Sequence, residues 1–159
     1  MAATYQWSES NGVGETPTDG IANLNFGDID APNLVPATYP IVAGTNSYQK
    51  YFRAKFTGTF TEISNMKFWK SVGAYKTGET CKGAVNVAYV QPVKTAEGGD
   101  TDVPEVEGSA WAVQAADGSA TITPPEDYTK YIRLQLRTTG STPAGSVNQK
   151  TLTFQYDEV

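Results

Sequence analysis

The sequence predicts an all-β domain: an antiparallel β-sandwich, jelly-roll or immunoglobulin-like, with an extended arm and long loops. Three observations predict this fold class. Short segments alternate apolar with polar side chains, which puts one face of a sheet on a core and the other in water. Turns that contain glycine or proline separate these segments. No stretch keeps the 3.6-residue period of an amphipathic helix.

The composition also favours strands. Aromatic residues make up 11% of the 159 residues, and aromatic side chains pack well on a pleated, half-buried surface. Charged residues make up 18%, below the roughly 25% of an average domain, so a surface of helical glutamate–lysine pairs is not expected. The length suits one domain, which can bury a core without disulfides.

In chain order, the predicted strands are residues 4–8, 21–26, 48–57, 62–69, 84–90, 111–114, 119–123, 131–137 and 151–156. The clearest is 131–137, where Ile132, Leu134 and Leu136 are expected on the core and Tyr131 and Gln135 on the wet face. The other inner sets are Phe52, Ala54 and Phe56; Val85, Val87 and Tyr89; and Leu152, Phe154 and Tyr156. The remaining segments carry a weaker alternation.

Two stretches do not fit compact strands. Residues 9–20 contain glycine, threonine and proline, and we expect an exposed arm or long loop there. Residues 94–108 carry five carboxylates and almost no apolar anchor, which predicts a mobile acidic loop. The predicted organisation is therefore an N-terminal strand and arm over 1–20, followed by a sandwich domain over 21–159.

Two aromatic residues lie near the amino terminus. Tyr5 and Trp7 share one face of the predicted strand 4–8. Chain ends usually fray, so aromatic side chains there indicate a terminus that is held in place. The holding surface is either the protein's own sheet or a neighbouring subunit.

The sequence contains few side chains suited to catalysis. We expect that the protein is not an enzyme and binds no cofactor and no metal. Histidine is absent, which removes the commonest general base and the usual transition-metal ligand. The single cysteine, Cys81, is expected to be a semi-buried small residue. The alternatives are a carboxylate pair, at Asp28 and Asp30 or at Glu126 and Asp127, and a Ca²⁺ site at Glu97, Asp100 and Asp102. Solvated turns and a solvated loop explain these carboxylates better.

Charge and hydropathy exclude two classes of partner. A net charge of −5 is unsuited to nucleic acid, whose phosphates require a basic patch. The nearest approach to one is a stripe of Lys50, Arg53, Lys55, Lys67 and Lys70, which we expect to form solvated faces or subunit contacts. No apolar run approaches 18 residues, so no membrane span is expected. Residues 1–15 lack signal-peptide features, which predicts synthesis in a cytoplasm without the usual export.

Aromatic side chains supply the candidate binding residues. Trp69, Tyr75 and Trp111 are typical of a platform on which sugar rings stack. Phe68 and Trp69 are sequence neighbours and point to opposite faces of a strand, so one is expected in the core and the other is a candidate for exposure. The interface candidates are Tyr5, Trp7, Trp69, Tyr75 and Trp111.

Four segments resemble small virion proteins of tailed bacteriophages. They are residues 3–12 (ATYQWSESNG), 23–27 (NLNFG), 60–69 (FTEISNMKFW) and 150–158 (KTLTFQYDE). The resemblance is one of overall style over most of the chain. It implies a capsid decoration (cement) protein, made in the host cytoplasm, that binds the major capsid protein at capsomer junctions on the virion surface, beside neighbouring copies or as a homo-oligomer.

Two other functions remain open at this point. One is a different virion component, such as a tail, connector or fibre domain. The other is a carbohydrate-binding or adhesin module that would bind glycans through the exposed aromatic residues.

Overall fold

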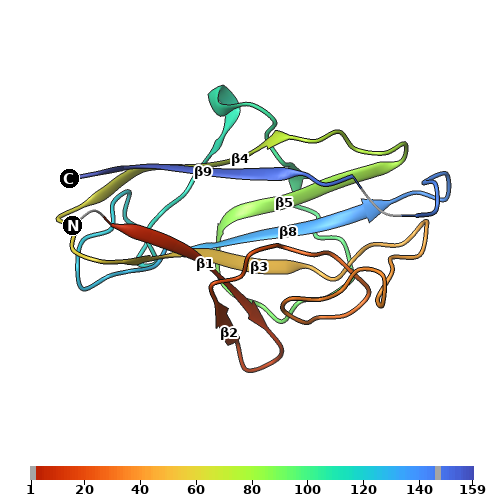
Figure 1. Ribbon diagram of the computed structural model, residues 1–159, viewed down its shortest axis with the longest axis horizontal. Coiled ribbons are helices and arrows are strands. Elements are labelled where there is room, and N and C mark those ends of the chain that lie inside the picture. The colour runs from red at the N-terminus through yellow and green to blue at the C-terminus, as the bar shows by residue number, and fades with distance from the viewer. Residues whose placement is uncertain (1–2, 146–147) are drawn as a thin grey trace.

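The computed structural model describes residues 3–145 and 148–159. This part of the chain forms two antiparallel sheets that face each other, with one 3₁₀ turn and no α-helix (Figure 1). The all-β sandwich predicted from the sequence is thus confirmed. Its elements are β1 (Thr4–Asn11), β2 (Thr16–Asp19), β3 (Lys50–Thr57), β4 (Ile63–Val72), β5 (Glu79–Val87), β6 (Thr101–Asp102), η1 (Glu107–Ser109), β7 (Trp111–Ala112), β8 (Tyr131–Thr138) and β9 (Thr151–Glu158).

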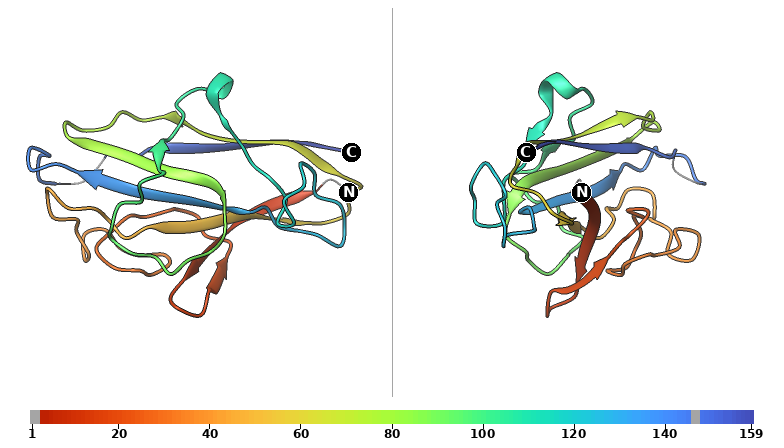
Figure 2. Two further views of the ribbon diagram at one scale, coloured as in Figure 1. Left: turned by 180° about the vertical axis from the view of Figure 1, so that it is seen from behind. Right: turned by 60° about the vertical axis from the view of Figure 1, so that its left-hand side comes forward.

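The two sheets differ in size. The larger has the order β2-β1-β3-β8-β5-β6, and the smaller has the order β7-β4-β9. Every pairing is antiparallel. Figure 2 shows β4 and β9 lying over the larger sheet, with the loops gathered at the sides and ends of the two layers. The Ala3 N–H donates to Glu158 Oε1 at 2.7 Å, so the first and last strands meet at one end of the sandwich.

The core lies between the sheets and is strongly aromatic. Trp7 of β1 packs edge-on against Phe52 of β3 and Phe154 of β9, with ring centroids 5.2 and 5.3 Å apart. This edge-to-face geometry stabilises aromatic pairs beyond the area that they bury. The predicted inner sets of β3, β8 and β9 all contribute to this core, either as buried residues or as partly buried residues packed on it.

The opposite face of β8 differs from the prediction. Tyr131 and Gln135 were expected to meet water, but both are buried. The reason is that loops cover the outer face of the larger sheet. Gln135 donates to the backbone carbonyl of Lys94, and Tyr131 packs beside Tyr89 at 5.7 Å.

A β-bulge breaks the alternation of β5. The register shifts between Val85 and Val87, and the intervening Asn86 has a positive φ of 61°. Asparagine tolerates this left-handed conformation better than most residues. Val85 therefore packs on the core, whereas Val87 and Tyr89 line a hollow with Tyr131 on the other face. The predicted inner set is correct only at Val85.

Residues 9–20 form a hairpin and not an exposed arm. β1 pairs with β3 on one side, from Thr4↔Thr57 to Ser10↔Tyr51, and with β2 on the other. The amino-terminal aromatic residues are consequently held in the protein's own sheet. Gly12, with a φ of 73°, supplies the left-handed conformation at the turn between β1 and β2.

Two weaker strand predictions fail. Residues 21–26 are irregular, and residues 119–123 contribute one isolated bridge, from Ile122 to Ile63. Conversely, β2 and β6 were not predicted, because four and two residues are too short to show an alternation.

Candidate functional site

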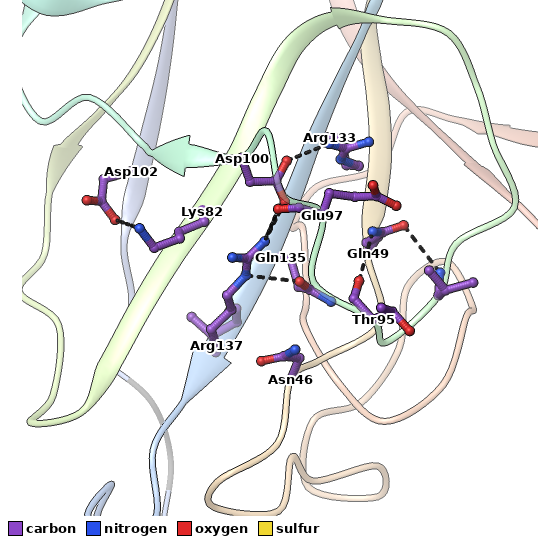
Figure 3. Close-up of polar contacts among 12 residues, drawn as sticks. Asn46, Gln49, Lys82, Thr95, Glu97, Asp100, Asp102, Arg133, Gln135 and Arg137 are labelled. Atoms are coloured by element: carbon purple, nitrogen blue, oxygen red, sulfur yellow. Dashed lines mark hydrogen bonds and ion pairs between the residues drawn. The ribbon is translucent and has the colours of Figure 1, made fainter.

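The acidic loop is fastened to the larger sheet at Asp100. Arg133 Nη2 lies 2.5 Å from Asp100 Oδ1, and Arg137 Nη2 lies 2.6 Å from Asp100 Oδ2. Figure 3 shows the carboxylate held between the two guanidinium groups. The Asp100 side chain has no exposed surface, so water does not screen these charge-assisted bonds strongly. This loop was expected to be mobile, but two arginines of β8 fasten it near its centre.

Three further ion pairs extend along the loop. Asp102 pairs with Lys82 of β5 at 3.0 Å, in the larger sheet (Figure 3). Glu105 and Glu107 pair with two lysines of β4, in the smaller sheet. The three carboxylates are more than half exposed, so each pair contributes little stability. Together they show that the loop crosses from one sheet to the other.

The proposed Ca²⁺ ligands do not converge. Asp100 and Asp102 point toward cationic side chains, as described above. Within the described residues, no group of three or more histidine, cysteine, aspartate or glutamate side chains is placed to hold a metal ion. The carboxylates of this loop therefore act as anchors to the two sheets.

Buried amides hold the first part of the loop. Gln135 Nε2 donates to the carbonyls of Ser47 and Lys94, each at 3.0 Å. Gln49 Nε2 donates to the carbonyl of Thr95 at 3.3 Å, and Gln49 Oε1 accepts from the Val93 N–H at 3.3 Å (Figure 3). These side chains satisfy backbone groups that the sheet does not pair, which explains why two glutamines are buried.

The carboxylates of the first candidate catalytic pair, Asp28 and Asp30, bind different partners. Asp28 forms an ion pair with Lys94. Asp30 accepts from Asn11 Nδ2 at 2.6 Å and from the Gly12 N–H at 2.8 Å. These contacts link three loops and give Asp28 and Asp30 different partners. At the other candidate pair, the backbone carbonyl of Asp127 accepts from the Phe56 N–H, in the turn that precedes β8.

Cys81 was expected to be semi-buried, and it lies fully in the core. It is buried on β5, and burial raises the pKa of its thiol to about 12. The nucleophilic form of cysteine is the thiolate. At neutral pH this side chain is therefore an inert apolar group.

The five aromatic interface candidates are mostly part of the core. Trp7, Tyr75 and Trp111 pack against the core cluster, and the Trp111 ring stacks on Phe68 at 6.2 Å with an interplanar angle of 21°. Trp69 is only 9% exposed, and Tyr5 is 37% exposed. Phe68 and Trp69 are both buried, so the expectation that one of them is exposed is wrong.

The residues of the predicted basic stripe do not form one continuous surface. Lys50 is fully buried and forms an ion pair with Glu9, so it does not belong to a solvated face. The Arg53 guanidinium lies over the Tyr128 and Tyr131 rings, at 4.0 and 4.6 Å from their centroids. These placements distribute the cations among separate local contacts.

A feature that the sequence did not reveal is a group of exposed apolar residues on three loops. The loops are residues 12–15, 28–45 and 88–97, and we call them the loop surface. Of the ten exposed large apolar residues in the described part of the chain, six lie on it: Val13, Val35, Tyr39, Val42, Val90 and Val93. Proline and glycine beside several of these valines are the only signal in the sequence.

Hydrogen bonds and an ion pair join the three loops of the loop surface. Tyr89 Oη donates to the Gly12 carbonyl at 2.5 Å, and Asp30 accepts from the Gly12 N–H. The Lys94–Asp28 ion pair joins the other two loops. Figure 1 shows the three loops in the lower half of the molecule.

Comparisons with known proteins give no relative. No protein-family model, curated protein or solved structure matches the chain. Among the described residues, no helix is long and apolar enough to cross a membrane.

Proposed function

We propose that this protein is a non-enzymatic structural component of a tailed-phage virion. In this proposal it decorates and stabilises the capsid by binding the major capsid protein at capsomer junctions. The observation that carries the proposal is the loop surface, where six exposed apolar side chains lie on three loops that are bonded to one another. The resemblance of residues 3–12, 23–27, 60–69 and 150–158 to small virion proteins supplies the class of partner.

Exposed apolar groups of this kind favour a protein partner. Apolar patches on a protein surface mark interaction sites, because covering them removes apolar area from water. Hydrogen bonds and an ion pair already order the three loops, so binding loses less conformational freedom than it would with mobile loops. On a shell that presents many equivalent junctions, neighbouring copies would add avidity to a modest single contact.

The structure supports the two alternative functions to different degrees. A tail, connector or fibre domain would use the same loop surface, and only the particle to which the protein binds separates that function from decoration. The carbohydrate-binding or adhesin function gains no support from the predicted aromatic platform, because Trp69 is buried and Trp111 stacks on Phe68.

The test is co-sedimentation of the purified protein with empty, expanded capsids of the phage that encodes it, followed by the capsid melting temperature. We expect saturable binding and a raised melting temperature. Binding to tails and not to heads would assign the protein to another part of the virion. Retention on a polysaccharide column without any binding to particles would contradict the proposal.

A further inference from the structure

One edge strand of the sandwich lacks several of the features that protect sheet edges. Natural sheets shorten their edge strands or place proline, lysine or bulges in them, because unpaired backbone groups attract other strands. β6 and β7 have two residues each, and β2 has four with Pro17 among them. β9, the edge of the smaller sheet, has eight residues without proline, glycine or lysine, and its two charged residues, Asp157 and Glu158, are the last two of the strand, away from the cavity at its start.

β9 is also regular along its length. Its ladder with β4 contains two register shifts, between Ser64 and Lys67 and between Lys70 and Val72. In both places the additional residue belongs to β4, so β4 bends and β9 stays continuous. No backbone hydrogen bond reaches the outer edge of β9 from any described residue.

Facing this edge is a segment with unpaired backbone groups. Residues 22–26 belong to the segment 21–26 that was predicted as a strand, yet they form no strand. Within the described chain, they make no backbone–backbone hydrogen bond. Among the described residues, their one side-chain hydrogen bond runs from Asn25 Nδ2 to the Leu34 carbonyl at 2.9 Å.

A cavity of about 350 Å³ separates residues 22–26 from the start of β9. Trp7 and Phe52 of the larger sheet line it, together with Leu24 on one wall and Leu152 of β9 on the other. Its volume lies in the range of about 300–1,000 Å³ that is typical of binding pockets. The walls are mainly apolar. Both walls belong to segments that have unpaired backbone N–H and C=O groups among the described residues.

The charges at the rim are already neutralised. Lys150 Nζ lies 2.5 Å from Glu79 Oε1, and Lys70 Nζ lies 3.2 Å from Glu105 Oε1. Tyr75 also lines the cavity, and its buried hydroxyl has no hydrogen-bond partner among the described residues. An occupant of this site is therefore uncharged, mainly apolar and able to form hydrogen bonds.

We propose that this site accepts an extended, uncharged segment of a partner protein, which adds a strand to β9. Main-chain hydrogen bonds to the free edge would supply affinity, and apolar side chains on one face of the segment would enter the cavity. A strand fits better than a small molecule because, in the part of the chain that the structure describes, the outer edge is unpaired along all eight residues of β9, beyond the cavity. A second copy fits less well, because the larger sheet continues under this edge: β9 packs over Tyr5, Trp7 and Phe56 of β1 and β3, and β2 lies further out.

This inference rests on the proposed function only for the identity of the partner. The test is hydrogen–deuterium exchange of the full chain with a capped seven-residue peptide in which threonine alternates with valine. We expect exchange in residues 22–26 and 151–158 to slow by roughly tenfold or more, in a saturable manner. The matched control is the same peptide with serine in place of each valine, which retains the backbone bonds but not the apolar side chains.

A pair of variants locates the binding. Leu24→Glu places a charge at the cavity and should abolish protection by the peptide, whereas Val42→Glu on the loop surface should leave it unchanged. Equal protection by both peptides, or none at any soluble concentration, would overturn the proposal. Protection that rises with protein concentration alone would assign the site to a second copy and overturn it too. If the protein binds the peptide but not the capsid, that result would support this inference and contradict the proposed function.

Discussion

Lys50 Nζ lies 2.7 Å from Glu9 Oε1, and both side chains are completely buried. They lie on the core-facing side of the larger sheet, since Glu9 is the cross-strand partner of Phe52. Lys50 also donates to the Ala31 carbonyl at 2.7 Å. The ion pair thus joins β1, β3 and the loop that follows β2, and so supports one side of the loop surface.

Lys50→Met should destabilise the fold strongly, because it leaves Glu9 buried without its cation. The expected loss in free energy of unfolding is about 3–5 kcal/mol, measured by urea denaturation. The control is Lys55→Met. Lys55 pairs with Asp19 at the surface, where an ion pair contributes about 0–1 kcal/mol. Equal losses in the two variants would show that burial does not control the contribution of these pairs.

Asp100→Asn should release the acidic loop. It removes the charge that both Arg133 and Arg137 contact, and leaves the two guanidinium groups without their anion. We expect faster exchange in residues 94–102, and a stability loss of about 2–4 kcal/mol for a buried, doubly paired charge. Asp102→Asn is the matched control, because the Asp102–Lys82 pair is exposed. Unchanged exchange in the Asp100 variant would show that the amide contacts alone order the loop.

Trp7→Ala should cost about 3–5 kcal/mol of stability, as is typical when a large aromatic side chain leaves a core. Tyr5→Ala should cost less, because Tyr5 is 37% exposed. Thermal and urea unfolding measure both effects. If Trp7→Ala kept full stability and lost only partner binding, Trp7 would be an interface residue, as the sequence suggested, and not a packing residue.

Cys81 should resist thiol reagents in the folded protein. Burial raises the pKa of the thiol from 9.0 to about 12, so the thiolate is scarce at pH 8. Because the pKa is higher in the folded state, this group favours folding below pH 9, and that contribution is lost as the pH rises from 9 toward 12. A colour assay with an aromatic disulfide at pH 8 should give a slow reaction that becomes fast in urea. Rapid reaction without urea would contradict the burial.

The inner faces of the strands were predictable because their residues are apolar at every second position. Leu134 and Leu136 of β8 show this clearly. The prediction failed at β5 because a single residue, Asn86, adopts a left-handed conformation and reverses the side chains after it. Nothing in the alternation of residues 84–90 marks that reversal.

The sites depend on contacts between residues far apart in the chain. A run of carboxylates predicts a solvated loop, unless it is known that Arg133 and Arg137 lie opposite Asp100. The loop surface likewise arises from three loops that meet only in the folded protein. Residues 22–26 are the opposite case: they belong to the segment 21–26 that was predicted as a strand, but among the described residues no strand pairs with them.

The central claim is that the loop surface binds the capsid, and one pair of variants tests it most directly. Val42 on the loop surface and Val106 outside it are 62% and 61% exposed. In co-sedimentation with expanded capsids, Val42→Asp should weaken binding roughly tenfold or more, as expected for a charge placed in an apolar interface. Val106→Asp should bind as the unchanged protein does. Equal binding by both variants, with both folded by circular dichroism, would contradict the account.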